Sequence, residues 1–188
     1  MMVALLASST FASAEVVRWS DIAGVITAPG VDNPVAVISD DTGNVVSSIH
    51  SGTLPWSVRQ GNARVDLNSG AVSFGVTGLV LIGGNATGTA GPINQVTGTL
   101  VCNAGSSATD SPQAVLDTPP VELGAFGDAQ FSGQLVGQVP SPCKAPQFLI
   151  RIGPAFGDFA GRWLATGVEP RPGQSVIDNL PARRLGIR

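Results

Sequence analysis

The sequence predicts an all-β protein built as an antiparallel two-sheet sandwich. Turn-forming residues recur about every ten residues between short apolar runs, which is typical of antiparallel sandwiches and barrels. Gly and Pro are abundant, at 24 and 14 residues, and only 12% of the chain is charged. We find no convincing helical period after residue 14. Roughly nine to eleven expected strands favour an Ig-like or jelly-roll-like sandwich, with a β-barrel as the alternative.

The clearest expected hairpin covers residues 63–76. Apolar and polar side chains alternate over residues 63–68 and again over residues 72–77. Asn68, Ser69 and Gly70 separate the two runs and supply a turn, in which Gly70 is free to take a positive φ.

Further strands are expected along the rest of the chain. Residues 96–102 and 129–136 alternate in the same way, and residues 148–152 and 162–168 read as two strands joined by a Gly-rich loop. Residues 79–82 are continuously apolar, so we expect a central strand that is covered on both sides.

Residues 1–14 resemble the end of an export signal. Ala12, Ser13 and Ala14 form the small-x-small pattern of a signal peptidase site, and the polar chain begins at Glu15. No Lys or Arg precedes the apolar stretch, so we expect the true start to lie upstream. The expected organisation is a signal peptide over 1–14, one β-sandwich domain over 15–168 and a flexible Pro- and Arg-containing tail over 169–188. The protein is then secreted, periplasmic or at the cell surface.

The two cysteines, Cys102 and Cys143, predict a disulfide in such a compartment. Closing the loop between them would stabilise the fold by roughly 3–4 kcal/mol on the chain-entropy estimate. Two thiols and one distant histidine do not make a zinc site, so we expect no metal and no cofactor.

The tryptophans are the best candidates for ligand binding. Sugar rings stack on flat aromatic faces, and an exposed Trp19, Trp56 or Trp163 would suit a carbohydrate-binding module. Packing in the core is the interpretation we favour, because indoles in strands are more often buried.

Catalytic patterns are sparse, and we expect no enzyme. His50 is the only histidine and is expected at a strand end, without a partner motif. A carboxylate-based hydrolase would have to use Asp117 and Asp128, with Arg151 or Arg162 as electrostatic support. Capping of turns is the simpler role for both aspartates.

Several segments resemble a group of small exported bacterial β-rich proteins with one cysteine pair. The likeness covers roughly residues 61–167 and is carried by 96–102, 117–123, 127–133, 148–152 and 161–163. The likeness brings no catalytic motif. The export signal, the alternating strands, the single cysteine pair and the sparse catalytic patterns together predict a secreted, non-catalytic sandwich that acts as an extracellular structural or interaction module. The alternatives are a glycan-binding module, a strand-exchanging fibre subunit and the hydrolase above. The net charge of −3, without a basic stripe, argues against nucleic acid as a partner. A membrane span is not expected either, because the sequence has no run of about twenty apolar residues.

Overall fold

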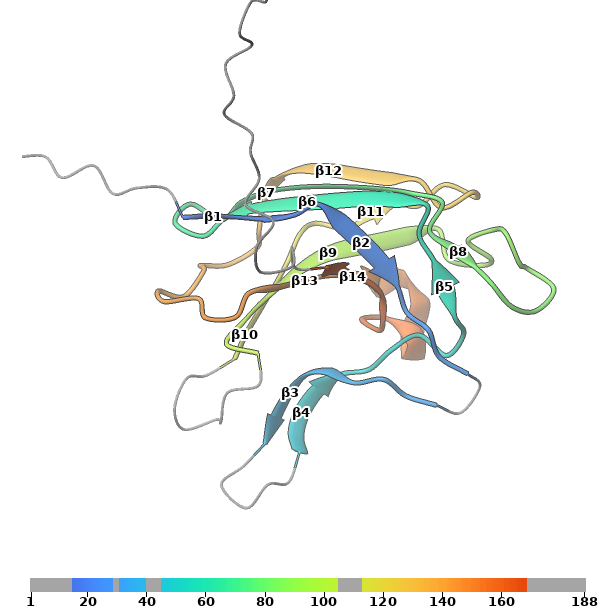
Figure 1. Ribbon diagram of the computed structural model, residues 1–188, viewed down its shortest axis with the longest axis horizontal. Helices are drawn as coiled ribbons and strands as arrows, with labels where there is room; N and C mark the ends of the chain where they lie inside the picture. Colours follow the sequence, from blue (N-terminus) through green and yellow to red (C-terminus); the bar gives the residue numbers. More distant parts are fainter. Residues whose placement is uncertain (1–14, 29–30, 40–44, 105–112, 169–188) are drawn as a thin grey trace, which may run out of the picture.

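The computed structural model describes residues 15–28, 31–39, 45–104 and 113–168. Its centre is a pair of antiparallel sheets, stacked as two layers (Figure 1). The four-stranded sheet has the order β1-β6-β7-β12. Its strands are β1 (Val16–Trp19), β6 (Gln60–Asp66), β7 (Ala71–Thr77) and β12 (Ala129–Gln134).

The second sheet has the order β10-β9-β13-β14-β2, with β11 also paired to β9. Every pairing between these strands is antiparallel. The all-β sandwich is therefore confirmed, and within the described residues neither sheet closes into the alternative barrel. Its strands are β2 (Asp21–Gly24), β9 (Gln95–Cys102), β10 (Ala114–Asp117), β11 (Val121–Glu122), β13 (Gln147–Ile152) and β14 (Trp163–Val168).

Two small ribbons and a 3-10 helix complete the described elements. The ribbons join β3 (Val35–Ser39) to β4 (Val45–Ile49), and β5 (Trp56–Ser57) to β8 (Val80–Leu81). The helix η1 (Pro154–Phe159) connects β13 to β14. The described residues form fourteen strands, more than the nine to eleven that the sequence suggests, because three of them, β5, β8 and β11, have only two residues each.

Aromatic rings fill the space between the two sheets. The ring of Phe148 lies 5.6 Å from the rings of both Trp19 and Phe74, measured between centroids. All three side chains are buried, and full burial of a large apolar side chain contributes about 1.5–3 kcal/mol. Room for the rings comes from Gly98, where a Cβ atom would lie 2.6 Å from Cε1 of Phe74.

The hairpin of β6 and β7 follows the sequence prediction. Phe74 pairs with Ala63, and Gly70 in the turn has a φ of +72°, a conformation that glycine adopts without strain. The Asp66 carboxylate accepts hydrogen bonds from the backbone N–H groups of Ser69 and Asn68, at 3.1 Å and 3.0 Å. These bonds hold the pKa of Asp66 below its usual range.

The prediction of a central strand over residues 79–82 is wrong. Only Val80 and Leu81 are extended, and they pair with β5 in a two-stranded ribbon outside the two main sheets. Leu79 and Leu81 are buried, whereas Ile82 is 45% exposed. Inward-facing and outward-facing side chains alternate here as in any strand. The sequence does not show this alternation, because the outward-facing side chains are apolar as well.

The expected signal peptide over 1–14 and the tail over 169–188 lie outside the described residues.

Candidate binding face on the four-stranded sheet

The outer face of the four-stranded sheet is polar because its strands alternate strictly. On β6, Ala63 and Val65 point into the core, so Gln60 and Asn62 face outward. Phe74 and its buried neighbours on β7 leave the odd-numbered residues 71–77 on the outer face. On β12, the even-numbered residues 130–134 share that face and are exposed.

A shallow hollow of about 700 Å³ crosses this face. Gly75 lies on the middle strand of the hollow, and a Cβ atom built there would meet nothing within 4 Å. The missing side chain therefore leaves open space above β7. The hollow is lined by Gln60, Gly61, Asn62, Gly75, Val76, Thr77, Val121, Glu122, Gly124, Asp128, Ala129 and Gln130.

The amides around the hollow are available to a ligand. The side chains of Gln60, Asn62 and Gln130 are exposed and make no hydrogen bond with another described residue. Each primary amide offers two N–H donors and an oxygen acceptor. Asp128 is partly engaged, because its Oδ1 accepts a hydrogen bond from the backbone N–H of Gly78 at 3.0 Å.

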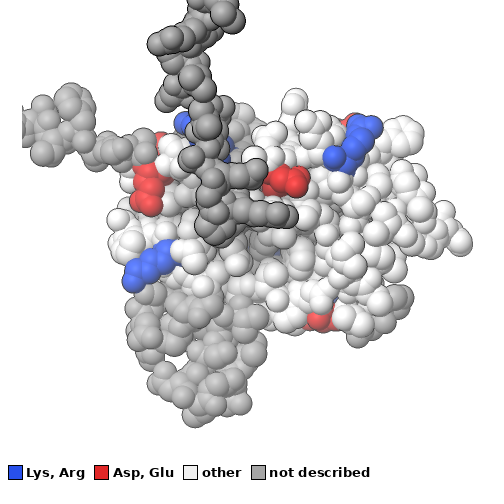
Figure 2. All heavy atoms as spheres, in the orientation of Figure 1, with Lys and Arg blue, Asp and Glu red and all other residues white. Residues whose placement is uncertain are grey.

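Charged groups are scattered and do not gather into a patch on the surface in Figure 2, where single Lys, Arg, Asp and Glu residues stand among uncharged atoms. The hollow contains two carboxylates, those of Glu122 and Asp128, and no cation. Such a surface can exchange hydrogen bonds with uncharged hydroxyl and amide groups. It offers nothing to hold a phosphate or sulfate.

The three tryptophans do not lie on this face. Trp19 is 1% exposed, Trp56 is 3% exposed and Trp163 is 6% exposed, so none presents an indole ring on which a sugar could stack. The structure supports the favoured packing interpretation and contradicts the alternative of exposed indoles. Trp163 has a further role, since its indole N–H donates to the carbonyl of Asn33 at 2.8 Å.

Of the four residues expected for a hydrolase, the structure brings together Asp117 and Arg151 but not the two aspartates. Asp117 forms an ion pair with Arg151, with a distance of 3.0 Å between Oδ1 and Nη1, and it also accepts a 2.6 Å hydrogen bond from the Thr99 hydroxyl. Asp117 and Arg151 line a hollow beside Gly161, whereas Asp128 lines the hollow over Gly75. Arg162 instead donates to the carbonyl of Ser51 at 3.0 Å. The expected acid–base pair therefore has no shared site.

The structure gives His50 a partner that sequence reasoning missed. Its Nδ1 is hydrogen-bonded to the carboxylate of Asp32, whose other oxygen accepts from the backbone N–H of Ser51 at 3.0 Å. Burial raises the pKa of Asp32, but the hydrogen bonds from His50 and Ser51 outweigh it and lower that pKa below its usual range. Asp32 belongs to a sequence that reads as a turn, so nothing in it pointed to a residue 18 positions away.

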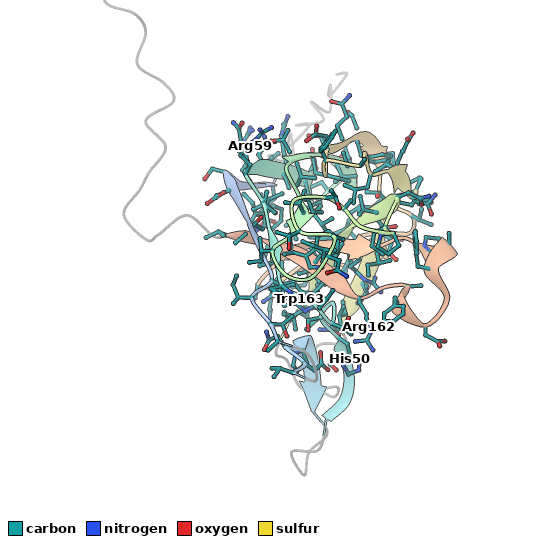
Figure 3. All side chains as sticks on the ribbon, turned by 90° about the vertical axis from the view of Figure 1, so that its right-hand side faces the viewer. His50, Arg59, Arg162 and Trp163 are labelled. Carbon is teal, nitrogen blue, oxygen red and sulfur yellow. A yellow bond between two sulfur atoms is a disulfide. The ribbon has the colours of Figure 1, made fainter. Side chains whose placement is uncertain are left out.

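These contacts fasten the β3–β4 hairpin to the sandwich. Figure 3 shows His50, Arg162 and Trp163 near one another at the base of the hairpin. The backbone N–H of Trp163 donates to the carbonyl of His50 at 2.9 Å, and that of Gly52 donates to the carbonyl of Trp163 at 2.8 Å. None of the described hydroxyl groups is hydrogen-bonded to Nε2 of His50, and Ser51 is 1% exposed. These contacts therefore have a structural role, which is to hold the base of the β3–β4 hairpin against β14.

The predicted cysteine pair is confirmed. The Sγ atoms of Cys102 and Cys143 lie 2.03 Å apart, at disulfide distance. In the described part of the chain, no group of three or more His, Cys, Asp or Glu side chains is placed to hold a metal ion. Nor does that part contain a helix of the length and apolar character that a bilayer span requires.

A comparison of the chain with protein-family models, with curated proteins and with solved structures gives no match.

Proposed function

We propose that this protein is an exported, non-catalytic interaction module that binds its partner through the outer face of the four-stranded sheet. The observation that carries the proposal is the hollow over Gly75. It is bordered by the side-chain amides of Gln60, Asn62 and Gln130, which make no hydrogen bond with another described residue. An ordinary solvated sheet face carries long charged side chains at such positions, whereas this one is small and amide-rich at its centre.

Two observations support an extracytoplasmic location. A cysteine pair at disulfide distance suits an oxidising compartment, and residues 1–14 have the pattern of an export signal.

The ligand class that fits the face best is an uncharged glycan. Hydroxyl groups both donate and accept hydrogen bonds, as the primary amides do, and the carboxylates of Glu122 and Asp128 accept from hydroxyls. Anionic ligands fit poorly, because no cation lines the hollow. Without an aromatic platform the affinity depends on hydrogen bonds alone, so we expect weak binding that several copies would strengthen.

The test is the substitution Gly75→Thr, assayed by glycan-array binding and titration calorimetry. Thr suits a strand, and the open space over Gly75 accepts it, so the denaturation midpoint should stay or rise. Its side chain fills the hollow, and we expect glycan affinity to fall by about tenfold or more, which is the loss of a few hydrogen bonds.

The matched control is Ala71→Thr, on the outer face of the same strand but outside the hollow. It should leave binding unchanged. If the unmodified protein binds no uncharged glycan, the ligand class is wrong. If Gly75→Thr binds glycan as well as the unmodified protein does, the site lies elsewhere.

A further inference from the structure

A second hollow, of about 410 Å³, lies directly beside the hollow over Gly75, at the end of the four-stranded sheet where β6 begins. We call it the end hollow. The two hollows share Asp128, which lines both of them. Arg59 lines the end hollow, and its neighbour in the chain, Gln60, lines the hollow over Gly75. An extended ligand that lies over Gly75 can therefore continue into the end hollow.

The end hollow has an exposed aromatic ring, which the hollow over Gly75 lacks. Phe126 lines the end hollow and is 72% exposed. Val58 and Val80 line the same hollow, and both are half-buried. Single apolar side chains on a surface are ordinary, whereas an apolar group gathered around a concave, partly polar surface is typical of a ligand site.

The turn that carries Phe126 is fixed to the rest of the protein on both sides of the ring. The backbone N–H of Ala90 donates to the carbonyl of Ala125 at 2.9 Å, and that of Leu79 donates to the carbonyl of Gly127 at 2.9 Å. Gly127 has a φ of +80°, and a Cβ atom there would lie 2.2 Å from the carbonyl oxygen of Leu79. Because this backbone is already ordered, little freedom is lost when a ligand covers the ring.

Polar groups border the ring. The guanidinium of Arg59 is exposed and makes no hydrogen bond or ion pair with another described residue. It lies at the opposite end of the view from His50 in Figure 3. Asp128 uses Oδ1 to accept from the backbone N–H of Gly78, which leaves Oδ2 for a ligand. The end hollow thus combines one cation with one carboxylate, a set that donates to and accepts from uncharged hydroxyl groups.

We infer that Phe126 is a stacking platform for a sugar ring, and that one uncharged glycan chain runs from the hollow over Gly75 past Asp128 to this ring. The inference rests on the proposed function and extends its site by a second sugar position. The C–H face of a pyranose packs on the phenyl ring, while its hydroxyl groups accept from Arg59 and donate to Asp128. Apolar contact at Phe126 then adds affinity only for chains long enough to reach it.

The test is titration calorimetry with oligosaccharides of glucose, mannose and xylose, each from one to six sugars long. For the sugar type that binds, we expect affinity to rise stepwise when the chain becomes long enough to span both hollows. Phe126→Ala should remove this step and lower the affinity for the longest oligosaccharide by roughly tenfold. It should leave the shortest binding oligosaccharide unaffected. Phe126→Trp keeps a ring and should retain the step.

The matched control is Phe159→Ala. Phe159 is also exposed, at 50%, but it lies on η1 and lines neither hollow. This variant should bind every oligosaccharide as the unmodified protein does. Both phenylalanines are exposed, so neither substitution should shift the denaturation midpoint.

A second pair of variants tests the guanidinium. Arg59→Met keeps an apolar stem beside Gly78 and removes the donors, so it should weaken binding of the long oligosaccharides alone. Arg64→Met is its control, because Arg64 lies on the same strand, β6, outside both hollows. We expect no change in affinity for that variant.

Proton NMR of the bound oligosaccharide detects the stacking itself. Sugar C–H protons that lie over a phenyl ring shift upfield, and this shift should disappear in Phe126→Ala. An unmodified protein that binds oligosaccharides, with a length step that survives Phe126→Ala, would overturn this inference and leave the proposed function standing. An unmodified protein that binds none of the oligosaccharides would overturn both. Binding that depends on Phe126 but is unchanged by Gly75→Thr would overturn the continuous chain across the two hollows.

Discussion

Single side chains secure the β3–β4 hairpin to the rest of the molecule. Trp163 contributes its indole N–H to Asn33 and its backbone to His50 and Gly52, while Asp32 ties His50 to Ser51. The same tryptophan is therefore both a core side chain and a clamp. Its burial explains why it is unsuited to ligand stacking.

Asp32→Asn should make stability less sensitive to acid. The folded-state pKa of Asp32 is lowered, so the stability it contributes is complete above the unfolded pKa and is lost as pH falls through the folded value. The unmodified protein should thus lose stability below about pH 4, whereas Asp32→Asn should be less stable near neutrality and show a flatter acid profile.

Urea unfolding across the acid range measures this effect. Asp158→Asn is the matched control, because Asp158 is exposed and makes no hydrogen bond with a described residue. Parallel acid profiles for the unmodified protein and Asp32→Asn would contradict the prediction.

Residue types predict some of these roles and not others. Two cysteines in an exported chain have one possible internal partner each, so their pairing follows from composition. The burial of Trp163 does not follow from residue type. Leu164, on the opposite face of the strand, is equally apolar, so the sequence does not say which face is buried. The partnership of His50 with Asp32 depends on how a turn folds back on a strand end, and no spacing rule encodes it.

At the scale of elements, two glycines on different strands have different structural roles. Gly98 on β9 makes room for core rings, whereas Gly75 on β7 opens a hollow on the outer face. The alternation of each strand decides which face its glycine affects.

Gly98→Ala should destabilise the fold by about 1–3 kcal/mol, the usual cost of overpacking a core. The added Cβ would lie 2.6 Å from Cε1 of Phe74 and 3.0 Å from Cζ of Phe148, and neither buried ring can yield easily. Guanidinium unfolding measures the change in the free energy of unfolding. Gly75→Ala is the control, because it adds the same methyl group to open space and should be neutral or stabilising by up to about 1 kcal/mol. Equal effects of the two substitutions would refute this account.

Strand prediction succeeded where alternation and turn chemistry agreed, as in the β6–β7 hairpin around Gly70. It was wrong at residues 79–82, where Ile82 is apolar although it is exposed, so that the local run looks like a buried strand. A run of four residues holds too little information to separate a central strand from an edge ribbon.

At the scale of the whole molecule, the hollow over Gly75 arises from long-range pairing. Strands β6, β7 and β12 meet although about 70 residues separate the first from the last, and β11 adds Glu122 from the second sheet. The sequence predicts the strands and the sandwich, but strand order is set by packing over these distances. The candidate site could not be located without it.

Removing the disulfide should lower global stability. The double variant Cys102→Ala and Cys143→Ala reopens a loop with a sequence separation of 41, which should reduce the free energy of unfolding by roughly 3–4 kcal/mol. Guanidinium unfolding with and without reductant measures it. The unmodified protein should lose the same amount on reduction, and the variant should not respond. A variant as stable as the oxidised protein would contradict the prediction.

The bond between Cys102 and Cys143 also decides how the protein responds to proteolysis. Any single backbone cut between the two cysteines, including cuts in β10, β11 or β12, leaves both fragments joined through sulfur. Such a nicked molecule migrates as one band on a non-reducing gel and as two after reduction, whereas a cut elsewhere yields two bands in both. Because β9 and β13 remain paired, a chain cleaved once in this span by an extracellular protease would still hold the two halves of its second sheet together.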